Sequence, residues 1–179
     1  MSDFTEKDYK IFEMFEKDWA LATAGTLEHF NSCTIAWGSL GTLWVKPGDG
    51  GETATIYLYP TRYTREFVQE SDQFTISFFP KSFKKMLGYM GVHSGRDGDK
   101  VAACGLTPIA MGESVTYEEA HLTFLCKKIY QHQFDKESLA PEIQEYYASS
   151  PHIFPCDENG DWQTHWVFVG RIIDVDDKR

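Results

Sequence analysis

The chain has 179 residues, 42% of them hydrophobic and 25% charged, a composition typical of a globular protein. Twenty-seven acidic residues against 17 basic ones give a formal net charge of −10, which disfavours nucleic acid and anionic membrane surfaces as partners. No stretch approaches the roughly 20 apolar residues that span a bilayer, and the acidic start lacks the apolar segment of a signal peptide. We therefore expect a cytoplasmic protein, with no membrane contact, that forms one domain over residues 1–179.

The cysteines and histidines show no metal-ligand spacing. The six histidines contain no pair four residues apart, and the four cysteines contain no pair three residues apart. We expect free, mostly buried thiols and no metal site. The cysteines are Cys33, Cys104, Cys126 and Cys156.

The first third predicts a helix followed by strands. Apolar residues at helical spacing predict an amphipathic N-terminal helix within residues 1–19; they are Ile11, Phe12, Phe15 and Trp19. A short strand follows at 20–25, and then a long β-branched run at 32–45. Gly38 and Gly41 interrupt that run, which indicates a bulge or a close approach of another group to the backbone.

The remaining elements favour a mainly β protein. Residues 47–51 (Pro-Gly-Asp-Gly-Gly) are the strongest turn signal, and the alternation from Thr53 to Tyr59 makes a hairpin with the preceding run. Further strands are expected at 75–79, 122–131 and 166–175, and helices at 61–71, 83–92, 99–104 and 139–148. About six strands with short helices favour an antiparallel β-barrel with helical additions.

The segment from Asn31 to Gly38 combines small polar residues, among them Thr34, with Ala36 and the aromatic Trp37. A planar ring such as an isoalloxazine needs backbone or amide donors at its edge and an aromatic or apolar wall at its face. This segment offers both. A barrel strand with Trp37 in the core explains the same residues.

Pro60 to Arg65 lies where a strand gives way to a helix. Free backbone N–H groups at a helix start, together with Arg62 and Thr64, suit a phosphate group. Alternatively, Thr61 is a simple N-cap and the arginines are solvated.

His93 to Lys100 is the third segment of interest. Ser94 and Arg96 offer hydrogen-bond donors beside a glycine, and Lys100 lies four residues further on. Asp97 or Asp99 can cap the helix that follows. An exposed loop before a capped helix is the plain alternative, and His93 alone is more often an ordinary histidine than a proton donor.

These three segments in this order, followed by Gly-Leu-Thr at 105–107, resemble the flavin reductase-like family, especially its flavoredoxin branch. The resemblance covers most of residues 21–175. The matching segments are 31–38, 62–64, 74–77, 94–100 and 105–107, with the late strands 122–126 and 168–175.

The resemblance implies an FMN-binding split β-barrel that is homodimeric, with FMN at the subunit interface. Asn31, Trp37, Thr64 and Lys100 match positions that contact the flavin in that family. Thr34 and Ala36, in the same segment as Asn31 and Trp37, are further candidates for cofactor binding. Arg62, Ser94 and Arg96 match phosphate or ribityl contacts. The N-terminal helix and an insertion at 135–160, with its Tyr146-Tyr147 helix, are longer than in the simplest members and could cover the open face of the flavin.

The function implied is an FMN-binding oxidoreductase that passes electrons from NAD(P)H through FMN to an acceptor such as free flavin or ferric complexes. Lys100 would stabilise the negative charge that reduction creates. His93 is the one candidate among the side chains for a direct part in catalysis, by assisting substrate binding.

Three alternatives stay open. The first is a flavoredoxin-type electron carrier reduced by a partner protein, and the second is a non-catalytic FMN-binding or sensory module. The third, hydrolysis by Cys126 with His121, is disfavoured because their spacing puts the two on opposite faces of a strand. No glycine-rich dinucleotide motif follows a strand, so a separate nicotinamide-binding domain is not expected.

Overall fold

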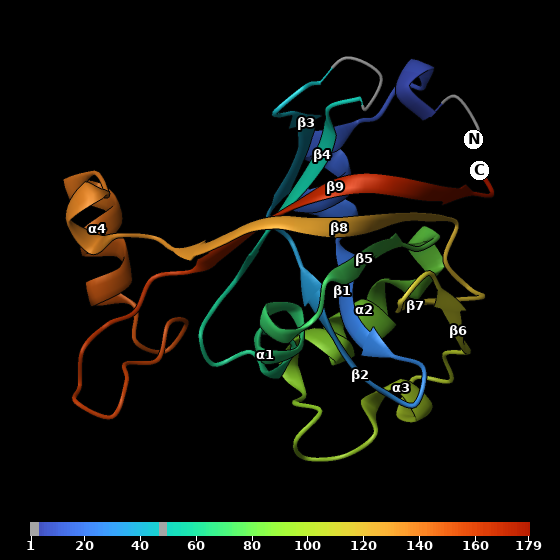
Figure 1. The fold of residues 1–179 in the computed structure, drawn as a ribbon. Coiled ribbons are helices and arrows are strands. Elements are labelled where there is room, and N and C mark those ends of the chain that lie inside the picture. Colours follow the sequence, from blue (N-terminus) through green and yellow to red (C-terminus); the bar gives the residue numbers. More distant parts are fainter. Residues whose placement is uncertain (1–3, 47–49) are drawn as a thin grey trace.

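The structure, a computed structural model, describes residues 4–46 and 50–179 (Figure 1). Seven strands form one antiparallel sheet in the order β2-β1-β5-β8-β9-β4-β3. They are β1 (Ala20–Thr26), β2 (His29–Ile35), β3 (Gly38–Thr42), β4 (Glu52–Leu58), β5 (Gln73–Phe78), β8 (Leu122–Gln133) and β9 (Trp166–Asp177). A second sheet is the hairpin of β6 (Pro108–Met111) and β7 (Ser114–Tyr117), which packs on β1 and β5.

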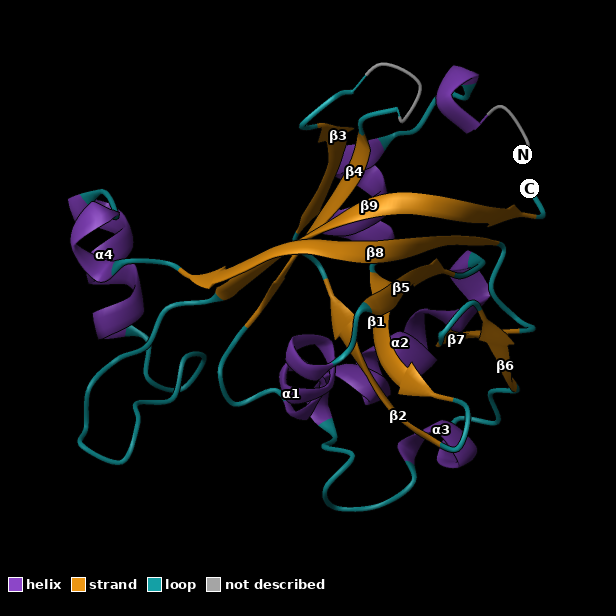
Figure 2. Cartoon of the chain, viewed as in Figure 1, coloured by secondary structure: helices purple, strands orange, loops and turns teal. Residues whose placement is uncertain are grey.

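The α-helices lie in two places (Figure 2). Three of them, α1 (Tyr63–Glu70), α2 (Lys84–Val92) and α3 (Lys100–Ala103), lie near β1 and β2, whereas α4 (Pro141–Ser149) lies at the far end of β8 and β9. Short 3-10 turns span Phe4–Glu6, Lys81–Phe83 and Lys136–Ser138. None of the helices in the described ranges is both long and apolar enough to cross a bilayer.

The core holds the sheet together through apolar side chains of its central strands. Phe74, Ile76, Phe124 and Phe168 are fully buried there. Removing such side chains from water stabilises the fold by roughly 1.5–3 kcal/mol each. A separate apolar cluster packs α2 against Leu21 of β1, which fixes the position of α2 beside β2.

The predicted N-terminal helix is much shorter than expected. Only residues 11–18 are helical, and Glu13–Asp18 form a π-helix; residues 1–3 lie outside the described part. The wider turn of a π-helix changes which residues share a face, so that Met14 and Phe15 are buried while Phe12 is 88% exposed. The residues before this segment contact the sheet through an ion pair, in which Lys7 lies 2.7 Å from Asp177 at the end of β9.

The predicted strands are confirmed with small shifts, but the run at 32–45 divides into β2 and β3. Gly38 opens β3, where a Cβ atom would lie 2.3 Å from the ring of Phe15, so the expected close approach is confirmed at this glycine. At Gly41 nothing lies within 4 Å of such an atom. β3 and β4 form the expected hairpin; of its predicted turn, residues 47–49 lie outside the described residues. The β6–β7 hairpin was not predicted.

The other helix predictions are also confirmed, with one correction to a cap and one to the burial of a cysteine. Asp99 is the N-cap of α3, accepting a hydrogen bond from the backbone of Ala102 at 2.9 Å, as the sequence allowed. Thr61 is not the N-cap of α1, because Arg62 occupies that position without a side-chain cap. All four thiols are free, but Cys156 is exposed because it lies on the loop after α4.

Candidate functional site

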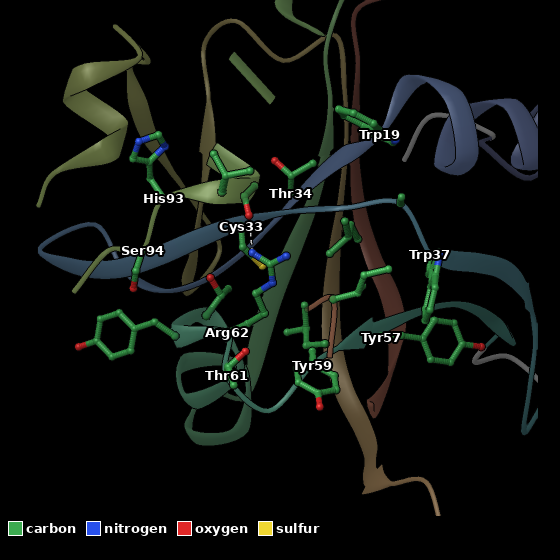
Figure 3. A pocket seen from close by; sticks show the side chains of 18 of the residues that line it. Trp19, Cys33, Thr34, Trp37, Tyr57, Tyr59, Thr61, Arg62, His93 and Ser94 are labelled. Carbon is green, nitrogen blue, oxygen red and sulfur yellow. Dashed lines mark hydrogen bonds between the residues drawn. The ribbon is translucent and has the colours of Figure 1, made fainter. Parts of the chain in front are cut away.

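A cavity of about 730 Å³ lies where the end of β2, the end of β4, the start of α1, the end of α2 and the loop after α4 meet. Its size falls within the range of roughly 300–1,000 Å³ that is usual for small-molecule and cofactor sites. Figure 3 shows that Ser94 and His93 lie at one side, Trp37 and Tyr57 at the other, and Arg62 between them. We call these two sides the polar end and the ring end.

Arg62 and Thr64 bring the start of α1 to the polar end. Arg62, at the N-cap, directs its guanidinium across the cavity and donates a hydrogen bond to the backbone carbonyl of Gly91 (Figure 3). Thr64 is buried, and its hydroxyl donates to Oδ1 of Asn31 at 3.5 Å. An anion here would meet a guanidinium and the free N–H groups of a helix start.

Asn31 supports the cavity from behind. It is 5% exposed and lies directly under Gly95, where a Cβ atom would come within 2.5 Å of its Nδ2. Any larger residue at position 95 would therefore have to displace the Asn31 side chain. Ser94 lines the cavity next to it, and its hydroxyl accepts a hydrogen bond from the backbone N–H of Arg96 at 3.1 Å.

Lys100 is buried at the base of the polar end. Its ammonium donates to the carbonyl of Met90 at 3.1 Å and to that of His93 at 2.9 Å, which satisfies the end of α2. Burial lowers the pKa of Lys100, and the nearby Arg62 adds to the effect. Two bonds leave one of the three N–H donors of an ammonium without a partner in the described structure.

Arg62 and Lys100 have no acidic partner among the residues that the structure describes. None of the ion pairs within the described ranges involves either residue. In a chain with a formal net charge of −10, two neighbouring cations without a carboxylate favour an anionic ligand.

Two of the predicted residues do not face the cavity in the expected way. Arg96 pairs with Glu66 and lies over the ring of Tyr63 at 4.2 Å, so its guanidinium is directed along the outside of α1. His93 lines the polar end, but its Nδ1 contacts the carbonyl of Tyr89 at 3.0 Å and its ring stacks on that of Tyr89.

The turn after β2 forms the wall between the two ends. Thr34 and Ala36 line the cavity, and the hydroxyl of Thr34 donates to the carbonyl of Leu87 at 2.5 Å, which holds β2 against α2. Trp37 is 44% exposed, so it is not the core residue of the alternative interpretation.

Aromatic side chains gather around Trp37 at the ring end, and sequence reasoning singled out none of those that line the cavity. They directly follow β4 or lie on the loop after α4, and they are Tyr59, Phe154 and His165. Tyr147 of α4, in the helix that the sequence did single out, packs behind them against Phe154 and His165. The ring centroid of His165 lies 4.6 Å from that of Trp37 and 5.2 Å from that of Tyr59. Burial lowers the pKa of His165 to about 4, with a smaller contribution from the positive charge of Arg62. The 135–160 insertion thus supplies part of the cavity wall, through residues 152–155.

A second, mostly apolar groove of about 810 Å³ adjoins the ring end. It lies between the N-terminal helical segment, β3 and α4, and Ala36, Trp37 and Tyr57 line both hollows. Exposed apolar side chains continue this surface, including Phe12, Ile143 and Tyr146.

Among the described residues, no three His, Cys, Asp or Glu side chains come together as a metal site would require.

No protein-family model matches the sequence, and no curated protein matches it either. Solved structures do share the fold. An FMN-binding protein from Thermus thermophilus, with bound 1-cyclohex-2-enone, superposes with a TM-score of 0.63 at 18% identity, over 99% of this chain and 76% of that one. The flavoredoxin from Methanosarcina acetivorans gives 0.63 at 18% identity, over 89% of this chain and 68% of its own.

A further similar structure is the flavoredoxin of Desulfovibrio vulgaris (Miyazaki F), with a TM-score of 0.60 at 20% identity, over 95% of this chain and 73% of that one. The fold is therefore that of the FMN-binding, flavin reductase-like split-barrel proteins, as the resemblance in the sequence implied.

Proposed function

We propose that the cavity binds FMN and that the protein is an oxidoreductase. The observation that carries this proposal is the pair of cations at the polar end, Arg62 and Lys100, which have no acidic partner within the described ranges of an acidic chain. Beside them lie the start of α1 and the hydroxyls of Thr64 and Ser94, a set of donors that suits a phosphate and a ribityl chain. Trp37 and its neighbours offer the aromatic wall for a ring.

FMN, when bound, would accept electrons from NAD(P)H and pass them to an acceptor such as free flavin or a ferric complex. The chain's part is to hold the phosphate at the polar end. Arg62, which lies between the two ends, also places a positive charge toward the ring, and a fixed cation favours the negative charge that reduction creates. One structure of the Thermus protein holds a cyclic enone, so we add small planar carbonyl compounds to the proposed acceptors.

We further propose a homodimer in the cytoplasm, with FMN at the interface. The apolar groove between the N-terminal segment and α4 supports the dimer, since large apolar surfaces of this kind usually mark interfaces. Trp37 and Tyr57 line both this groove and the cavity, so a second copy in the groove would lie against the ring end.

An electron carrier reduced by a partner protein is the second candidate, and the flavoredoxin neighbours favour it. A non-catalytic FMN-binding or sensory module is the third. The cavity is equally consistent with a reductase, an electron carrier and a binding module, because all three require the same cofactor site.

The deciding experiment adds NADH and NADPH, separately and without oxygen, to the FMN-saturated protein and follows the visible flavin spectrum. The proposal expects rapid bleaching with one of the two nucleotides, and turnover when free flavin or a ferric complex is then supplied. If the flavin bleaches only after a separate reductase protein is added, this protein is an electron carrier and not an NAD(P)H-dependent reductase. If the flavin stays oxidised under all these conditions, the non-catalytic FMN-binding module is the one candidate that remains.

A further inference from the structure

Tyr147 and His165 form a buried contact between the insertion and the last strand. The phenol oxygen of Tyr147, on α4, lies 2.6 Å from Nδ1 of His165, which directly precedes β9. The two residues are 4% and 7% exposed. His165 lines the cavity, whereas Tyr147 lines the apolar groove behind it, so the imidazole lies between the phenol and the cavity.

The direction of this hydrogen bond follows from the surroundings of the phenol. Burial raises the pKa of Tyr147, so the phenol keeps its proton. Nδ1 of His165 is the one hydrogen-bond partner of the phenol oxygen among the described residues, so the buried O–H is satisfied when it donates to Nδ1. The imidazole is neutral, because burial and Arg62 lower the pKa of His165. A neutral ring that accepts at Nδ1 carries its proton on Nε2.

Nε2 of His165 has no hydrogen-bond partner among the described residues, and it is not one of the fully buried atoms, so it opens onto the cavity that His165 lines. Its surroundings are aromatic: the ring lies 4.6 Å from Trp37, 5.2 Å from Tyr59 and 5.6 Å from Phe154, measured between centroids. Trp37 and Tyr59 can be followed at this end of the cavity in Figure 3. An N–H that opens onto a mostly aromatic part of the cavity can donate to a ligand oxygen there in place of water. The ligand that fits is planar, uncharged and carries one acceptor oxygen.

We propose that Tyr147 is a positioning residue for His165, and that Nε2–H of His165 donates a hydrogen bond to the carbonyl oxygen of a planar ketone or aldehyde at the ring end. This inference rests on the proposed function, because it takes the carbonyl compound as the electron acceptor. Tyr147 lies in the 135–160 insertion, so the insertion does more than cover the cavity. It fixes which nitrogen of His165 carries the proton.

The first test is ¹⁵N NMR of the imidazoles, which reports which nitrogen of a neutral histidine is protonated. His165 in the unaltered protein should carry its proton on Nε2. Tyr147→Phe should give a mixture of the two tautomers, whereas Tyr146→Phe, which removes the exposed neighbouring hydroxyl, should behave as the unaltered protein. A proton on Nδ1, or a Tyr147→Phe spectrum identical to that of the unaltered protein, overturns the proposal.

The second test compares two probes of the same shape on the FMN-saturated protein: acetophenone, which has a carbonyl oxygen, and α-methylstyrene, which has a CH₂ group in its place. Perturbation of the flavin spectrum gives both dissociation constants. One hydrogen bond should make acetophenone bind about tenfold more tightly. His165→Phe should abolish that preference, and Tyr147→Phe should reduce it.

The two proposals fail differently. Equal affinity for both probes in a protein that binds FMN overturns this inference and leaves the proposed function intact. If FMN does not bind, the proposed function fails. Quenching of intrinsic tryptophan fluorescence then gives the dissociation constants of acetophenone and α-methylstyrene. A ketone preference that depends on His165 then still supports the hydrogen bond, and equal affinities overturn it.

Discussion

His165 should make the protein lose stability as the pH falls from about 6.5 to about 4. Its pKa is about 4 in the folded protein against an ordinary 6.5. Between these values the unfolded chain binds more protons than the folded one, so acid favours unfolding and the stabilisation present above pH 6.5 is lost as pH falls through 4. A difference of about 2.5 pH units, at about 1.36 kcal/mol each, corresponds to about 3 kcal/mol. His165→Phe should remove this part of the pH dependence, because phenylalanine does not titrate.

The assay is urea unfolding at closely spaced pH values from 7 to 4, at the same FMN saturation for each protein. Other groups also contribute to the loss of stability at low pH. Burial lowers the pKa of His121, and Arg179 and Lys7 hold the pKa of Asp177 low. These contributions are common to both proteins, so the difference between the two curves isolates His165. The control is His132→Gln, which removes an exposed imidazole on β8. Parallel curves for His165→Phe and the unaltered protein would show that His165 keeps an ordinary pKa in the folded protein.

Two further predictions follow from the packing and from the cavity. Gly170→Ala should destabilise the protein by about 1–3 kcal/mol in urea unfolding, since the added Cβ would lie 2.7 Å from the ring of Phe74, whereas Gly41→Ala should cost much less because nothing lies within 4 Å there. Equal midpoints for these two variants would contradict the packing. Arg62→Ala should weaken FMN about tenfold or more while changing the affinity for riboflavin, which lacks the phosphate, by less than about threefold. Arg96→Ala should leave both affinities nearly unchanged, because Arg96 pairs with Glu66 outside the cavity; fluorescence titration measures all four values, and a larger loss from Arg96→Ala than from Arg62→Ala would contradict the site.

Strands with strict alternation were predictable from the sequence, and short or tightly wound elements were not. The alternation at 53–59 identified β4, because buried and half-buried positions alternate with the pleat from Ala54 to Leu58. β6 and β7 have four residues each, too few for a period to show. The N-terminal segment has helical spacing, yet its π-helical turn buries Met14 and leaves Phe12 exposed, which no spacing rule for an α-helix predicts.

The polar end of the site was also predictable in large part, because its residues lie in short, ordered motifs. Arg62, Ser94 and Lys100 all line the cavity. The motif did not determine where Arg96 points, since that depends on Glu66, which lies on α1 and is distant in the sequence. His165 belongs to no motif, and only the return of the chain after α4 brings it beside Trp37.

The most direct test of the central claim is a titration of the purified protein with FMN, followed by quenching of flavin fluorescence and by the visible spectrum. The account predicts saturation at about one FMN per chain and weaker binding of riboflavin, because Arg62 and the start of α1 would hold the phosphate. A colourless protein that quenches no FMN fluorescence would contradict the assignment of the cavity and, with it, the proposed oxidoreductase.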